Sequence, residues 1–301
     1  MARLRWAPVV LTLVLVPVAC ATAQPLAEPS ASPQAPGANP QTPAAPAQAR
    51  VEAQPRLTPE QMHAFLTTAK IIRERDSGKG VTDTVRATLS DGTLTHDAQF
   101  QTVDEARAIF EAGAKSEINF KDTYRYNIAG YRLAQLVGLQ TVPMSAERRY
   151  KGKDSAVTWW IDDVMFDEGG RQALKGKMMG PDPARTQKQL YVMYAWDELI
   201  QNRDRNQGNL QWTRDWTLWL IDHTRAFRTG DELLKPERLV RCERSFFEGL
   251  KQLTEQSLTQ AMKGILRQEE IRPILRRRDV IVQHFEKLIA ERGEMAVLYS
   301  M

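Results

Sequence analysis

Three oxygen-bearing side chains, Asp204, Asn209 and Asp222, stand in an order that suits a divalent metal held against a phosphate. The first two lie in one polar loop, and Asp222 directly follows the apolar run 218–221. Carboxylate and amide oxygens are hard ligands that suit Mg²⁺, and phosphoryl transfer needs little beyond such metals and a positioned acceptor. An isolated Asp and Asn in a loop are usually capping groups, but a further aspartate after an apolar strand is a rarer coincidence. The spacing therefore predicts a metal–phosphate site.

Two segments resemble a known superfamily. Residues 204–209 and Ile221-Asp222 are similar to the catalytic loop and metal aspartate of the atypical kinases, a group that includes phosphatidylinositol 3-/4-kinase-like, HipA-like and secretory-pathway kinases. The usual pattern there is Asp-Arg-His-x-x-Asn, then Ile-Asp-Phe-Gly. Residues 124–139 resemble the N-lobe helix of bacterial members. The resemblance spans about residues 86–227 and identifies the chain as a bacterial exported member.

The resemblance implies a fold and a set of roles. The fold would be α+β and two-lobed, like a protein kinase, with a strand-rich N-lobe and a mainly helical C-lobe. Asp204 would be the catalytic base, and Asn209 and Asp222 would be metal ligands. The cofactors would be Mg²⁺ and ATP, and the acceptor would be a protein, a sugar or a lipid.

The N-lobe departs from the family pattern at its nucleotide grip. Gln101 occupies the place of the usual lysine, and Asn127 occupies the place of its glutamate partner. Replacing one member alone would leave a buried unpaired charge, whereas replacing both predicts a neutral amide pair. The catalytic segments depart as well, because His223 replaces an aromatic residue and Thr224 replaces a glycine. Asn206 stands where histidine is common.

Other residues could supply the missing contacts with nucleotide. Arg205 or Arg225 could provide the positive charge, and Lys121 or the nearby Lys115 could do so from the N-lobe. Trp160 lies where the hinge strand of the family would run, so it could contact an adenine ring.

Three functions stay open at this point. The chain is an active phosphotransferase with a rearranged phosphate grip, a pseudokinase that binds or scaffolds, or a structural lipoprotein whose polar loop is incidental. Retention of all three metal-site residues favours the enzyme. Scarcity of ATP outside the bacterial inner membrane favours the scaffold.

The N-terminus predicts export. Arg3 and Arg5 precede the apolar run 6–19 and a stretch of small residues, which is typical of a secretory signal peptide. Cleavage after Ala23 would make residues 1–23 the signal. Alternatively, residues 18–20 resemble a lipobox, so that the signal ends before Cys20 and this cysteine carries a lipid tether to the membrane. We expect a periplasmic, membrane-anchored or secreted protein.

The remaining chain divides by composition and periodicity. Residues 24–56 are rich in Pro and Ala and predict a disordered linker, and residues 57–301 predict the kinase-like domain. We expect an N-lobe at about 81–164 and a C-lobe at about 186–301. The spacing of apolar residues predicts helices at 58–75, 123–138 and 186–200, and several more over 236–292. Strands are expected at 83–89, 94–103, 141–149, 156–164, 210–212 and 217–221, and 106–115 is expected to be helical or irregular.

Charge and cysteine usage exclude other classes. The net charge is +4, from 41 basic and 37 acidic residues, and no basic block is interleaved with aromatics. Nucleic acid is therefore not an expected partner. With Cys20 removed or lipidated, Cys242 has no intrachain partner, so neither a disulfide nor a zinc site is predicted.

Overall fold

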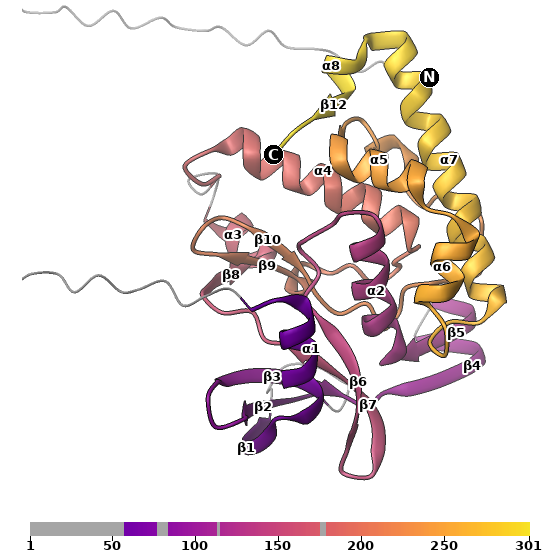
Figure 1. Ribbon diagram of the computed structural model, residues 1–301. Helices are drawn as coiled ribbons and strands as arrows, with labels where there is room; N and C mark the ends of the chain where they lie inside the picture. Colours follow the sequence, from indigo (N-terminus) through magenta and orange to yellow (C-terminus); the bar gives the residue numbers. More distant parts are fainter. Residues whose placement is uncertain (1–56, 77–83, 113–114, 175–178) are drawn as a thin grey trace, which may run out of the picture. The chain divides into compact units, whose positions relative to one another are not determined.

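A five-stranded antiparallel sheet with the order β1-β2-β3-β7-β6 forms the N-terminal part of the described chain (Figure 1). The computed structural model describes residues 57–76, 84–112, 115–174 and 179–301, all within the unit Pro55–Met301. The predicted signal 1–23 and linker 24–56 lie outside them. The sheet is built from β1 (Lys70–Asp76), β2 (Thr84–Ser90), β3 (Thr95–Gln101), β6 (Ser145–Tyr150) and β7 (Lys153–Trp159).

Two helices cover opposite faces of this sheet. Successive residues of a strand point to opposite faces. Val157 of β7 joins a cluster with Phe65 and Leu66 of α1 (Pro59–Thr68), whereas Ala156 joins the cluster of α2 (Arg125–Leu136). The same alternation in β3 turns Phe100 toward α1 and leaves Gln101 on the α2 side. The sequence therefore aims Gln101 at the helix that carries Asn127.

The second part is mainly helical and carries two small sheets, one of three strands and one of two. Its helices are α3 (Glu168–Ala173), α4 (Pro183–Leu199), α5 (Arg244–Gln252), α6 (Glu255–Ala261), α7 (Gln268–Arg292) and α8 (Glu294–Val297), with the 3₁₀ turns η1 (Gln207–Asn209) and η2 (Pro236–Arg238). Its strands are β8 (Val164–Asp167), β9 (Leu210–Thr213), β10 (Leu218–Leu220), β11 (Cys242–Glu243) and β12 (Leu298–Tyr299). No helix in the described ranges has the length and apolar content to cross a membrane.

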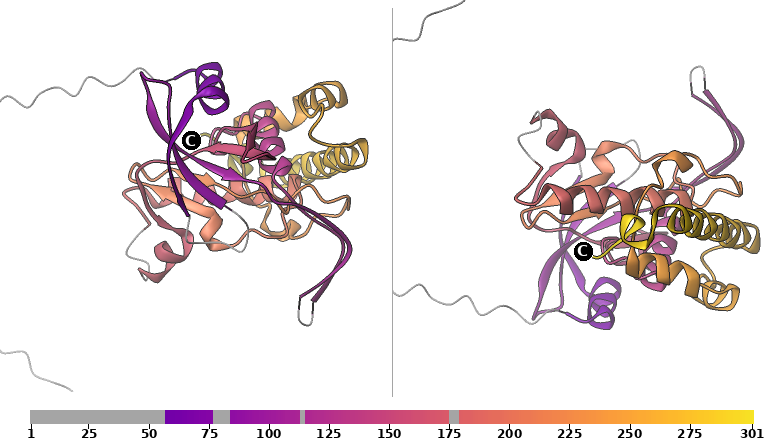
Figure 2. Two further views of the ribbon diagram at one scale, coloured as in Figure 1. Left: turned by 90° about the horizontal axis from the view of Figure 1, so that it is seen from below. Right: turned by 90° about the horizontal axis from the view of Figure 1, so that it is seen from above.

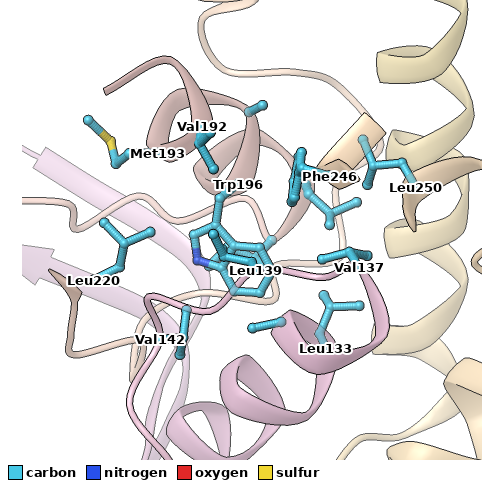
Figure 3. Packing of buried hydrophobic residues seen from close by; sticks show 14 of the residues in the cluster. Leu133, Val137, Leu139, Val142, Val192, Met193, Trp196, Leu220, Phe246 and Leu250 are labelled. Atoms are coloured by element: carbon cyan, nitrogen blue, oxygen red, sulfur yellow. The ribbon is translucent and has the colours of Figure 1, made fainter. Parts of the chain in front are cut away.

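One apolar core joins the two parts. Trp196 of α4 is fully buried in one cluster with Leu133 and Val137 at the end of α2 and with Phe246 and Leu250 of α5 (Figure 3). Burying apolar area contributes about 25 cal/mol per Å², so aromatic residues such as Trp196 contribute strongly to this junction. The helix from the N-lobe is thus anchored to the C-lobe.

A two-stranded ribbon projects from the rest of the domain (Figure 2). It consists of β4 (Asp104–Ala112) and β5 (Lys115–Thr123), which pair with each other and with no other strand of the described chain. Ile109 and Ile118 face each other across the pair and are largely exposed. The base of β5 leads directly into α2, so the ribbon is fixed beside the centre of the domain.

Two expected elements are wrong. The predicted helix 58–75 begins as expected, since Thr58 caps it and Pro59 is its first residue, but it ends at Thr68. Residues from Lys70 pair with β2 instead, because β-branched residues favour a pleated sheet once a partner strand is present. Of residues 106–115, expected to be helical or irregular, 106–112 are strand because they pair with the following strand β5, which begins at Lys115, and 113–114 lie outside the described residues.

Candidate functional site

The loop after α4 and the hairpin β9–β10 bring Asn209 and Asp222 together. Asn209 ends η1, and its carbonyl accepts a hydrogen bond from Ile221 N–H at 3.1 Å. Arg205 fixes this crossing, because its guanidinium donates to the carbonyls of Asn209 at 3.2 Å and Ile221 at 2.7 Å. Asn209 and Asp222 line the same cavity of about 350 Å³, the interlobe cavity.

The backbone of Asp222 is held in an uncommon conformation. Its φ is +52°, in the left-handed region that side-chain-bearing residues seldom adopt. The Asp222 Oδ1 accepts a hydrogen bond from Thr224 Oγ1 at 3.0 Å. Such strain persists only where surrounding contacts over-determine it, and it concentrates at functional sites. Thr224, which stands in place of the family's glycine, therefore orients the aspartate.

Asp204 lies in the same loop but does not line the interlobe cavity. Its Oδ1 is 3.3 Å from Arg225 Nη1, and the side chain is 46% exposed. A carboxylate that is half exposed and held by one arginine is open to a hydroxyl arriving from solvent. The structure thus separates Asp204 from the metal-ligand candidates in the way that separate roles would require.

Asp122, at the base of β5, is a further acidic residue that the sequence analysis missed. Burial raises the pKa of its carboxyl, and the nearby charges of Asp222 and Asp204 raise it further, while Thr224 and Arg225 oppose the shift. Its Oδ1 is buried and has no hydrogen-bond partner among the described residues. No local motif marks Asp122, since only the ribbon's pairing brings it to this site.

The predicted amide pair is present. Gln101 Oε1 accepts a hydrogen bond from Asn127 Nδ2 at 2.6 Å, and both side chains are buried. The other end of the Asn127 amide, Oδ1, accepts from His223 N–H at 2.8 Å. Asn127 therefore links the N-lobe sheet to the residue after Asp222. The two amides pair without any charge, as predicted for a double replacement.

The interlobe cavity has an apolar side near the hinge. Trp160 lines it, and the guanidinium of Arg86 stacks on the Trp160 ring at 4.1 Å while it pairs with Asp97. Among the described residues that line the cavity, none is a lysine or an arginine. Asp222 is the charged side chain on its wall. The cavity thus offers a flat apolar surface at one end and oxygen ligands at the other.

Arg205 is not brought to this cavity. Its side chain is only 8% exposed, and it pairs with Asp197 Oδ1 at 3.0 Å and lies 3.3 Å from His223 Nε2. Arg205 therefore holds the loop in place through buried contacts. The sequence interpretation that placed Arg205 against phosphate does not match this position. Lys121 is also engaged, with Glu270 of α7, and the Lys115 side chain lies outside the described ones.

His223 fills the place of the family's aromatic residue. Its ring is buried, accepts from Trp196 Nε1 at 3.1 Å and packs edge-on against that indole. Burial lowers the pKa of His223 well below its ordinary value, and Arg205 lowers it further, so the ring is neutral. A Cβ on Gly130 would lie 3.2 Å from the His223 ring, so the glycine of α2 makes room for it.

The donor set at Asn209 and Asp222 fits a hard divalent cation. One carboxylate and one amide oxygen converge on a shared cavity, which suits a metal that keeps water and phosphate oxygens as its remaining ligands. No group of three His, Cys, Asp or Glu side chains in the described part of the chain forms a metal cluster by itself. A metal here would therefore depend on the phosphates it binds.

No protein-family model and no curated protein sequence matches the chain. Solved structures do match it. Hydra Fam20 in complex with sugar aligns with a TM-score of 0.61 and 14% identity over 80% of this chain and 92% of its own. The Golgi casein kinase with Mn/ADP bound aligns with a TM-score of 0.59 and 15% identity over 81% and 80%. The Helicobacter pylori proinflammatory kinase CtkA aligns with a TM-score of 0.50 and 10% identity over 76% and 99%.

At these identities the comparisons establish the fold. The chain has the mixed α+β, two-lobed fold of the atypical kinases, with a strand-rich N-lobe and a mainly helical C-lobe. The fold predicted from the short catalytic segments is confirmed. The roles of the individual site residues rest on the geometry given above.

Proposed function

We propose that this atypical-kinase fold transfers the γ-phosphoryl group of ATP to an acceptor hydroxyl. The observation that carries the proposal is that Asn209 and Asp222 line one cavity with the apolar Trp160, while Asp204 stands outside it and half exposed. Nucleotide would lie along the cavity with its base toward Trp160. Its phosphates would reach the metal ligands.

Asn209 and Asp222 would hold the metal, for which we propose Mg²⁺. A divalent metal supplies neutralisation of phosphate charge and in-line orientation, which are the main requirements of phosphoryl transfer. The solved Golgi casein kinase carries Mn/ADP, which supports a divalent metal and a nucleotide in this fold. Because no arginine or lysine lines the described cavity wall, neutralisation by metal would matter more here than in a site with a lysine.

Asp204 would act as the base. Its carboxylate accepts the proton of the acceptor hydroxyl while the oxygen attacks phosphorus, and Arg225 holds the carboxylate in place at 3.3 Å. A sugar acceptor gains support from the sugar in hydra Fam20, and a protein or lipid hydroxyl would use the same chemistry. We further propose export, with Cys20 as the tether if the lipoprotein route is used. The mass of the mature N-terminus distinguishes the two routes.

A second candidate function is a pseudokinase scaffold. The neutral pair Gln101–Asn127 removes the cation that would hold nucleotide phosphates, and this observation favours it. A scaffold does not require the strained backbone of Asp222 at the cavity wall, so this feature favours the enzyme.

The two functions separate in a binding and turnover experiment. Ligand at 100 times its Kd stabilises a native protein by about 2.7 kcal/mol, so Mg–ATP or Mn–ATP should raise the Tm of the full chain. Asp222→Asn should abolish the rise, and Asp154→Asn, at an exposed aspartate near the start of β7, should retain it. Transfer of labelled phosphate from ATP to protein, sugar and lipid acceptors then tests catalysis.

Asp204→Ala should keep the Tm rise and lower turnover by about 100-fold or more, because a positioned base contributes that much. Binding with no transfer to any acceptor would favour the scaffold. No Tm rise at millimolar nucleotide would exclude both nucleotide-dependent functions.

A further inference from the structure

A second cavity lies beside the catalytic loop, between the base of the β4–β5 ribbon and the start of α7. We call it the ribbon cavity. It has a volume of about 900 Å³ and is lined by Lys121, Arg203, Arg228 and Arg267, among others. Cavities of about 300–1,000 Å³ accommodate small molecules. Arg203 is the chain neighbour of Asp204, so this cavity begins next to the proposed base.

A line of charged side chains connects Asp204 to the wall of the ribbon cavity. Arg225 contacts Asp204 at 3.3 Å and Glu117 Oε2 at 3.1 Å, and the other oxygen of Glu117 is 2.7 Å from Arg228 Nη2. Both guanidiniums lie over the buried ring of Phe120, at 5.0 and 5.5 Å. Glu117 therefore lies between two arginines, and one of them, Arg225, also pairs with Asp204.

The buried donors of this cluster lack acceptors. Arg228 is 7% exposed, yet its Nε has no hydrogen-bond partner among the described residues, and neither does Nε of Arg225. The Arg228 Nη2 contact with Glu117 is close but lacks the geometry of a hydrogen bond. Buried polar groups are almost always paired, so the unpartnered Nε of Arg228, a residue that lines the ribbon cavity, indicates a place for a further acceptor. An oxyanion provides such acceptors in the planar arrangement that arginine matches.

The mouth of the cavity has further arginines in weak pairs. Arg203 is 3.5 Å from Glu232, and Arg267 is 3.4 Å from Glu269, and all four side chains are at least 42% exposed. Exposed pairs of this kind contribute little and are readily exchanged. Of the described side chains that line the ribbon cavity, five are basic and three are acidic. The lining therefore carries two more basic than acidic side chains, and the arginines at its mouth stand in exposed pairs that an anion could replace.

We propose that the ribbon cavity is the acceptor subsite and that it selects a small polyol carrying a carboxylate, sulfate or phosphate group. This inference rests on the proposed phosphotransferase function. The anionic group would pair with Arg228 and the mouth arginines, which would set an acceptor hydroxyl against Asp204. That oxygen forms a bond to the γ-phosphorus as the bond from phosphorus to the β–γ bridging oxygen breaks. ADP leaves with the bonding electrons, and Asp204 takes the hydroxyl proton.

Matched probes test the chemistry of the subsite. Titration calorimetry on the full chain would compare D-glucose 6-phosphate and D-glucuronate with uncharged D-glucose. We expect both anionic probes, or one of them, to bind at least about tenfold more tightly than glucose, since one charge-assisted hydrogen bond supplies a difference of that size. The two anionic probes distinguish a phosphate from a carboxylate. Equal binding of all three, or of none, would overturn the proposal.

Variants locate the site. Arg203→Gln and Arg267→Gln are exposed substitutions that leave the buried cluster intact, and each should weaken anion binding about tenfold. Arg292→Gln, at the opposite end of α7 and about 37 Å along the helix, should leave it unchanged. Anion binding that survives both mouth variants would place the site elsewhere and overturn the inference.

Nucleotide binding separates this inference from the proposed function. The rise in Tm with Mn–ATP should be the same in Arg203→Gln and Arg267→Gln as in the unmodified chain. Loss of that rise would mean that these arginines hold the nucleotide, which would refute an acceptor subsite. If Mn–ATP binds and no anionic probe does, the inference fails alone. If the probes bind and no nucleotide does, the acceptor role falls with the function.

Discussion

The amide pair Gln101–Asn127 is the residue-scale feature that sets this site apart from its family pattern. Its hydrogen bond of 2.6 Å is the neutral equivalent of an ion pair, and Asn127 also holds the backbone next to Asp222. A neutral pair avoids the desolvation of two charges. The pair itself provides no cation, so under the proposed function the phosphates of a nucleotide would gain no positive charge from it.

Restoring the charges tests this view. Gln101→Lys alone should cost about 3 kcal/mol of unfolding free energy, because it places an unpaired cation in a buried site. Gln101→Lys combined with Asn127→Glu should regain about 2 kcal/mol or more, because the partners lie in contact. Urea denaturation of both single variants, the double variant and the unmodified chain measures the coupling. The double variant should also bind Mn–ATP more tightly, and additive stabilities would contradict the pairing.

At the scale of elements, α5 packs directly on the end of α2 through a glycine. A Cβ on Gly249 would lie 2.5 Å from the carbonyl oxygen of Val137, which belongs to the backbone and cannot rotate away. Gly249→Ala should therefore destabilise the protein by about 2 kcal/mol, although alanine is the better helix former by about 1 kcal/mol. Thermal or urea unfolding measures this. As a control, Lys251→Ala on the exposed side of α5 should change the free energy of unfolding by less than about 0.5 kcal/mol. A Gly249→Ala variant as stable as the unmodified protein would show that the two helices are not in contact.

Local sequence predicted elements well where local signals decide them. The cap at Thr58, the turn before β10 and the helical spacing before Gly138 are such signals. The local sequence did not predict β1 and β4 as strands, because these residues are strands through pairing with the next strands, β2 and β5, rather than through their own composition.

In the candidate site, too, some residues could be assigned from local sequence signals and others could not. The short motifs predicted that Asn209 and Asp222 lie close together, because the hairpin between these two residues returns the chain to its starting point. Arg205 and Asp122 could not be assigned from spacing, since the role of the first depends on the buried partner Asp197 and the place of the second depends on a projecting ribbon. Burial raises the pKa of Asp197 despite the arginine beside it.

At the scale of the whole domain, the two lobes are joined by a core and by several polar contacts, of which one is a latch at a buried carboxylate. The core runs from α2 to α4 and α5, as Figure 3 shows. The latch is Glu270 of α7, which pairs with Lys121 of β5 and accepts from Tyr126 OH at 2.6 Å. Its other oxygen caps α7 by accepting from Arg267 N–H at 2.8 Å. A single buried carboxylate therefore ties the ribbon, α2 and the longest helix together.

Replacing that carboxylate should have an effect that depends on pH. Burial acts to raise the pKa of Glu270, but hydrogen bonds from the Arg267 backbone, Lys121 and Tyr126 outweigh it and hold the pKa below the ordinary 4.5. A lowered folded pKa means that the carboxylate's stabilisation is complete above the ordinary value and is lost as pH falls through the folded one. Glu270→Gln should therefore cost about 2 kcal/mol at pH 7, the scale of a buried charge-assisted hydrogen bond, and progressively less below pH 4.5. Urea denaturation across pH 3–7 would measure the difference, with the exposed neighbour Glu269→Gln as a control within about 0.5 kcal/mol. A cost that stays the same at every pH would mean that the charge of Glu270 does not hold the lobes together.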